Sequence, residues 1–164
     1  EKEEYKRDIF GKHPIDILKS AGVTDKNEIE KRVDEHDKKF LMNLGKIKVF
    51  PEAKFVLQTL KKNNIRLAVL SNNKKQVVEA ILKKFSLLSF FDQIVGIEYG
   101  TKPYPQGLLK AIELLKVEKL KMLYIGDTFI DVQTGKNAGV KTIIVGKDIK
   151  YLGELPKYIE KIVC

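Results

Sequence analysis

From residue 46 onward, short apolar runs alternate with stretches in which apolar residues recur every three or four positions. The runs cover residues 65–70, 91–97, 122–125 and 142–145. Such runs are typical of buried strands, and the spacing between them is typical of helices that bury one face. Strands that alternate with helices predict an α/β fold with a doubly wound, Rossmann-like parallel sheet and right-handed crossovers.

The first 45 residues contain no run of the strand type. Two helices are expected there, at residues 15–21 and 28–44, and each ends at a glycine. We therefore predict a helical piece at residues 1–45 and an α/β core at residues 46–164. The sequence leaves open whether the C-terminal tail holds a short strand at Tyr158–Ile159 or a frayed helix.

Composition excludes several classes of protein. No apolar run approaches the roughly 20 residues that span a membrane, and the single cysteine, Cys164, excludes a disulfide framework and a Cys-x-x-Cys zinc site. We expect a cytoplasmic protein without a membrane partner, and the oligomeric state stays open. The net charge of +9 comes from lysines interspersed with glutamates. This pattern argues against a nucleic-acid partner and favours an anionic small substrate.

Two aspartates follow the third predicted strand. Asp127 comes directly after this strand and Gly126, and Asp131 lies one helical turn further along on the same face. Open α/β sheets bind ligands at the carboxyl ends of their strands, and two carboxylates there suit Mg²⁺. The residues alone leave it equally open that Asp127 merely caps the following helix, because aspartate is a favoured N-cap residue.

Two further polar groups follow strands in the same way. Ser71–Asn72 come after the first predicted strand, and Lys102 comes after the second. A serine hydroxyl at a helix start suits phosphate oxygens, and a lysine can neutralise phosphate or hold a carboxylate. Taken singly, Ser71–Asn72 could equally form a helix cap and a turn, and Lys102 could equally be an ordinary surface lysine. Their order favours one convergent site, since parallel strands end at the same edge of a sheet.

These groups together resemble motifs of the haloacid dehalogenase-like hydrolases. The second, third and fourth motifs of that family are similar to Leu70-Ser71-Asn72, Lys102-Pro103-Tyr104-Pro105 and Gly126-Asp127-Thr128-Phe129-Ile130-Asp131. The nearest branch is the phosphoglycolate phosphatase-like one with a helical cap. The resemblance implies a haloacid dehalogenase-like core at residues 46–164, which lacks its N-terminal strand, and a small, truncated cap at residues 1–45.

The resemblance also implies a phosphoric monoester hydrolase that uses Mg²⁺ and acts on a small phosphorylated metabolite. Ser71 would hydrogen-bond the phosphate with help from Asn72, and Lys102 would stabilise the charge of phosphate and nucleophile. Asp127 would bind Mg²⁺ directly, and Asp131 would bind it through water or hold Lys102. In this family the phosphoryl group passes to an aspartate, and water then hydrolyses the aspartyl-phosphate.

The family's first motif, a strand followed by Asp-x-Asp-x-Thr, does not occur in this sequence. The segment that begins at Asp8 is the nearest match, but no second aspartate follows two residues later and the residues before it are mostly charged. Since that motif supplies the nucleophile and the central strand, two unpaired strand edges are expected. The sequence then fits a piece of an active phosphatase or an inactive phosphate- and metal-binding relative. It also leaves open a sugar-phosphate mutase of the same superfamily or a receiver-like domain. A receiver-like domain would place its acidic pair near the N-terminus, and this chain does not.

Four remaining side chains are expected to have no direct role. His13 and His36 have no ligand partners nearby in the sequence, which indicates surface or packing positions. Tyr104 and Phe129 flank motif residues and are expected to pack in preference to shaping a pocket.

Overall fold

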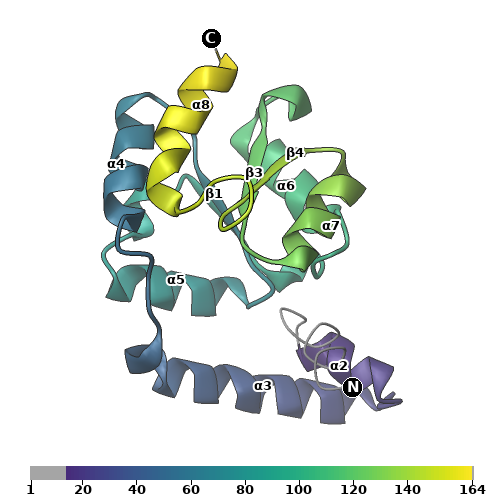
Figure 1. Cartoon of the computed structure of the whole chain (residues 1–164). Coiled ribbons are helices and arrows are strands. Elements are labelled where there is room, and N and C mark those ends of the chain that lie inside the picture. Colours follow the sequence, from purple (N-terminus) through teal and green to yellow (C-terminus); the bar gives the residue numbers. More distant parts are fainter. Residues whose placement is uncertain (1–13, 164) are drawn as a thin grey trace.

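The computed structural model describes residues 14–163 of the chain (Figure 1). The helices are α2 (Pro14–Ser20), α3 (Lys26–Met42), α4 (Ala53–Lys62), α5 (Lys75–Lys84), α6 (Gln106–Leu115), α7 (Phe129–Ala138) and α8 (Leu155–Val163). The strands are β1 (Ala68–Leu70), β2 (Gln93–Val95), β3 (Leu123–Gly126) and β4 (Lys141–Ile144). The predicted helices and strands are present, although β1 and β2 are shorter than their apolar runs. The tail forms a helix, α8, and not a strand.

The strands form two parallel pairs. β1 pairs with β2, with Ala68 opposite Gln93, and β3 pairs with β4, with Leu123 opposite Lys141. Within residues 14–163 no ladder of hydrogen bonds joins β1 to β3. The parallel α/β class is therefore confirmed, but the described strands do not form one continuous sheet. The open edges of β1 and β3 are those expected if a central strand is not among these residues.

Helices cover both faces of the strands (Figure 1). Successive residues of a strand point to opposite faces, and β3 shows this clearly. Leu123 and Ile125 pack in the cluster that joins α4 and α8 to β4, whereas Tyr124 packs in the cluster that joins α6 to α7. Apolar helix faces on either side of parallel strands define the predicted doubly wound, Rossmann-like core.

The regular elements of residues 14–46, here called the helical segment, are all helices. Asp25 begins α3 as its N-cap, because its carboxylate accepts the backbone N–H of Glu28 at 2.9 Å. α3 buries Ile29 and Val33 and packs against α2 and α5. Since α5 begins just after β1, the helical segment lies beside the carboxyl end of that strand (Figure 1). None of the described helices is long and apolar enough to cross a bilayer.

The close approach of α7 to β4 generates a prediction. A Cβ at Gly135 would overlap Thr142 Oγ1 and lie 2.9 Å from Thr142 Cβ. We expect Gly135→Ala to lower the free energy of unfolding by about 1–3 kcal/mol through overpacking, despite the better helix propensity of alanine. Urea unfolding measures this change. Gly45→Ala is the matched control, since the nearest atom to its Cβ would be Lys84 Nζ at 4.0 Å. Equal stability of the two variants would contradict the prediction.

Candidate functional site

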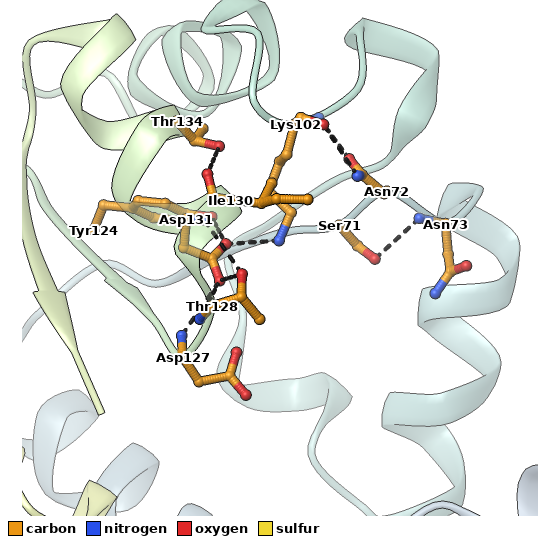
Figure 2. Close-up of polar contacts among 10 residues, drawn as sticks. All are labelled: Ser71, Asn72, Asn73, Lys102, Tyr124, Asp127, Thr128, Ile130, Asp131 and Thr134. Atoms are coloured by element: carbon orange, nitrogen blue, oxygen red, sulfur yellow. Dashed lines mark hydrogen bonds and ion pairs between the residues drawn. The ribbon is translucent and has the colours of Figure 1, made fainter. Parts of the chain in front are cut away.

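The loops that follow β1, β2 and β3 meet at one edge of the core (Figure 2). Ser71 and Asn72 follow β1 directly, Lys102 lies between β2 and α6, and Asp131 lies in the first turn of α7. The Nζ of Lys102 lies 2.7 Å from Asp131 Oδ1, and its backbone N–H donates to Asn72 Oδ1 at 2.6 Å. The structure thus brings together three strand-end groups that are far apart in the sequence.

Asp131 lies at the centre of this cluster, and both of its carboxylate oxygens are engaged. The residue is only 2% exposed. Its Oδ1 accepts hydrogen bonds from Lys102 Nζ at 2.7 Å and from Tyr124 Oη at 2.6 Å. Its Oδ2 accepts from Thr128 Oγ1 at 2.6 Å and from the backbone N–H groups of Thr128 and Asp127 at 3.1 and 3.3 Å. Such partners are required, because an unpaired buried charge is strongly destabilising.

The local sequence explains how Asp131 reaches this position. Thr128 is the N-cap of α7 and forms a capping box with Asp131, in which each side chain accepts the backbone N–H of the other. Gly126 leaves room for the carboxylate, since a Cβ there would lie 2.6 Å from Asp131 Cγ. The N-cap is therefore Thr128, and the alternative in which Asp127 merely caps the helix is wrong.

The surroundings of Asp131 also control its ionisation. Burial raises the pKa of Asp131, but the charge and hydrogen bond of Lys102, with hydrogen bonds from Thr128 and Tyr124, outweigh burial and lower the pKa to about 2. Burial, together with the charge of Asp131, raises the pKa of Tyr124, which stays a neutral donor. Asp131 is therefore ionised at neutral pH and holds the Lys102 ammonium in place.

Asn72 fixes the loop that carries Lys102. Its Oδ1 accepts the backbone N–H of Lys102 at 2.6 Å, and its Nδ2 donates to the backbone carbonyl of Lys102 at 3.4 Å. The following peptide bond, Lys102–Pro103, is cis, and Asn137 Nδ2 donates to the Pro103 carbonyl at 2.9 Å. Asn72, expected to assist phosphate binding, thus has a clear positioning contact in this structure. The lysine is held at its backbone as well as at its ammonium.

Ser71 and Asp127 add a hydroxyl and a second carboxylate to the site (Figure 2). Ser71 Oγ accepts the backbone N–H of Asn73 at 3.1 Å, an arrangement that leaves its hydroxyl hydrogen for another acceptor. The side chain of Asp127 is exposed, and Figure 2 shows its carboxylate directed away from the Asp131 cluster.

The oxygen atoms of the site suit Mg²⁺, but few of them are placed to bind it directly. Mg²⁺ prefers oxygen ligands and is commonly bound by one or two carboxylates, with water and phosphate oxygens completing the shell. Asp127 offers such a carboxylate, whereas the oxygens of Asp131 are already engaged by protein donors. Residues 14–163 contain no group of three or more His, Cys, Asp or Glu side chains placed to hold a metal ion. A metal here would therefore have Asp127 as its direct ligand and Asp131 as an indirect partner.

Two residues of the cluster were missed by sequence reasoning. Tyr124 looked like an ordinary apolar strand residue, and only the fold places its hydroxyl on Asp131. Thr128 had a readable signal, because Thr-x-x-Asp before a helix resembles a capping box with aspartate in the glutamate position.

The remaining expectations have mixed outcomes. Tyr104 and Phe129 are 61% and 62% exposed, so the expectation that they pack is wrong. His36 is partly buried beside an aromatic ring of α3, in agreement with a packing position. Asp8 and His13 lie outside the described residues.

The shifted pKa of Asp131 leads to a prediction about acid stability. Folding lowers this pKa from 3.8 to about 2, so the stabilising contribution is fully present above about pH 4 and is lost as the pH falls through about 2. The difference in free energy of unfolding between the unmodified chain and Asp131→Asn should therefore stay constant above pH 4 and shrink toward pH 2. Urea unfolding in metal-free buffer measures it. A difference that does not change down to pH 2 would rule out this linkage.

Comparison with known proteins relates the site to a family. A family model described as haloacid dehalogenase-like hydrolase matches residues 1–145. The phosphoglycolate phosphatase of Aquifex aeolicus is 40% identical over 99 residues, which cover 59% of this chain and 46% of that protein. The pyrophosphatase PpaX of Bacillus mycoides is 36% identical over 104 residues, which cover 62% of this chain and 48% of that protein. The chain thus spans about half the length of these two curated relatives.

Solved structures agree with this relationship. A Bacteroides fragilis protein described as haloacid dehalogenase-like superposes with a TM-score of 0.78 at 27% identity, covering 93% of this chain and 81% of that one. A haloacid dehalogenase-superfamily hydrolase from Ehrlichia chaffeensis gives 0.65 at 29% identity, covering 71% and 60%. The family model covers most of the sequence, including all three motif groups of the site. This chain belongs to the haloacid dehalogenase-like hydrolases.

Proposed function

We propose that this chain carries the phosphate- and metal-binding part of a Mg²⁺-dependent phosphatase that acts on a small phosphorylated metabolite. The ion pair between Lys102 and the buried Asp131, at 2.7 Å, is the observation that carries the proposal. It holds a positive charge at the ends of parallel strands, where the β1 loop also presents Ser71. The relatives named phosphoglycolate phosphatase and pyrophosphatase support the same class of substrate.

Each residue of the site would have a distinct part. Ser71 would donate its hydroxyl to a phosphate oxygen, and Lys102 would neutralise negative charge on the phosphoryl group and on the attacking carboxylate. Asp131 and Asn72 would be positioning residues, since they hold the ammonium and the backbone of Lys102. Asp127 would bind Mg²⁺, whose charge would further neutralise the phosphate.

The proposed reaction needs a carboxylate nucleophile. A carboxylate oxygen attacks phosphorus, the bond from phosphorus to the leaving oxygen breaks, and that oxygen takes up a proton. Water then attacks the phosphorus of the aspartyl-phosphate, which releases inorganic phosphate and restores the carboxylate. We propose that this group lies on a strand between β1 and β3, supplied by polypeptide outside residues 1–164. The lack of a ladder between these two strands within residues 14–163 supports this placement.

Metal binding tests the acidic side of the site. We expect Asp127→Asn to weaken Mg²⁺ binding by the 164-residue chain, in the presence of inorganic phosphate, by at least about tenfold. Loss of a residue that contacts a metal only indirectly already lowers metal affinity by about tenfold or more, so loss of a direct, charged ligand should lower it at least as much. Isothermal titration calorimetry measures the affinity. Glu118→Gln is the control, because that side chain is 70% exposed and pairs with Lys121. Unchanged Mg²⁺ affinity in Asp127→Asn would show that the metal site is misplaced.

Turnover tests the basic side of the site. A polypeptide that joins this chain to a segment with an Asp-x-Asp-x-Thr motif should hydrolyse p-nitrophenyl phosphate with Mg²⁺. Lys102→Met should then lower kcat by about a hundredfold or more, because it removes a charge aimed at the transition state. Steady-state kinetics measures both effects. A folded protein that carries the motif and shows no turnover would contradict the proposed activity. Turnover that Lys102→Met leaves unchanged would contradict the role of the lysine.

A further inference from the structure

Lys74 links the loop after β1 to the helical segment. It stands directly before α5, two residues after Asn72. Its Nζ lies 2.7 Å from Asp34 Oδ1 and 3.1 Å from Asp37 Oδ2, and both aspartates belong to α3. The loop that carries Ser71 is therefore tied to a helix that contributes none of the site residues described above.

The two ion pairs of Lys74 differ in burial. The side chain of Asp34 is 52% exposed, and an exposed pair contributes little. The side chain of Asp37 is only 9% exposed, and besides Lys74 it has His36 Nδ1 at 3.6 Å from its Oδ1. Removing one partner of a buried pair leaves an uncompensated charge and is strongly destabilising. Asp34 makes the shorter contact with Lys74, whereas Asp37 is the partner whose buried charge would lose its compensation if Lys74 were removed.

A second polar contact between the helical segment and the core falls beside the same site. The hydroxyl of Thr101 donates to Asp16 Oδ1 of α2 at 3.4 Å, and Thr101 is buried and directly precedes Lys102. Both side chains of the core that make these contacts are thus close neighbours of site residues along the chain. The position of the helical segment and the geometry of the site are linked at two loops.

We infer that Lys74 is a positioning residue, which holds the loop of residues 71–73 in its phosphate-binding geometry and couples that geometry to the placement of α3. Within the loop, Ser71 Oγ accepts the backbone N–H of Asn73 at 3.1 Å, and Asn72 holds the Lys102 backbone at 2.6 Å. Because Lys74 directly follows this loop in the chain, we expect its displacement to shift both the Ser71 hydroxyl and the backbone of Lys102. This inference rests on the proposed phosphate site but adds a residue outside it.

Hydrogen–deuterium exchange on the 164-residue chain tests the coupling. Lys74→Met removes the cation and keeps most of the side-chain length. We expect exchange to rise at least about tenfold both in α3 and at residues 71–73, as the loss of a buried ion-pair partner implies. Lys75→Met is the matched control, since Lys75 is 55% exposed and pairs with Glu79 of its own helix at 3.9 Å. A rise confined to α3, or an equal rise in both variants, would overturn the inference.

Phosphate affinity separates positioning from general stability. Lys74→Met should weaken binding of inorganic phosphate, measured with Mg²⁺ present, by about tenfold, whereas Lys74→Arg should retain it. Adding Asp37→Asn to Lys74→Met removes the unpaired buried charge. This double variant should regain stability toward urea but not phosphate affinity. Phosphate affinity that recovers together with stability would overturn the inference.

The outcomes distinguish this inference from the proposed function. If the unmodified chain binds no inorganic phosphate, the proposed phosphate site fails. The exchange experiment still decides whether Lys74 ties the loop of residues 71–73 to α3, because that readout requires no ligand. If phosphate binds and Lys74→Met changes neither exchange nor affinity, the proposed function stands and the role of Lys74 is overturned.

Discussion

The ion pair between Lys102 and Asp131 is the interaction on which the rest of the site depends. A carboxylate that is 2% exposed must be surrounded by donors, and these donors come from several parts of the chain. Tyr124 reaches it from β3, Thr128 from the start of α7, and Lys102 from the loop after β2. Through Asn72, the loop after β1 joins the same network. The network around this one buried charge therefore links the loops that follow three different strands.

A second buried carboxylate, that of Asp37, is also paired with a lysine, but among the described residues it has fewer partners than Asp131. Asp37 on α3 pairs with Lys74, just as Asp131 on α7 pairs with Lys102, and in both pairs the lysine lies in a loop after a strand. Both lysines follow Ser71–Asn72 in the sequence, Lys74 in the same loop and Lys102 in the loop after β2. Asp131 has several further donors, whereas Asp37 depends far more on its one lysine. This difference makes the Lys74 contact the more sensitive link between the helical segment and the site.

Much of the fold could be predicted because it depends on local spacing. Apolar residues at helical spacing identified the helices, and short apolar runs identified the strands, with errors of a few residues at their ends. The convergence of Ser71, Lys102 and Asp127 could also be predicted, because parallel strands end at one edge. The exposure of Phe129 could not, since burial depends on whether another element covers that face. The tail was equally undecided by its residues alone, and packing of α8 against α4 gave it a helical form.

The sequence by itself determined the α/β class, the order of the polar groups and the family resemblance, because these depend only on residue type and spacing. Only the tertiary structure decided that Asp131 holds Lys102, that Asn72 holds the lysine backbone, and that Thr128, not Asp127, caps α7. It also showed two strand pairs without a joining ladder within residues 14–163. The physical reason is that hydrogen-bond partners of a buried carboxylate are chosen in three dimensions, by which donors can reach it without leaving other polar groups unsatisfied.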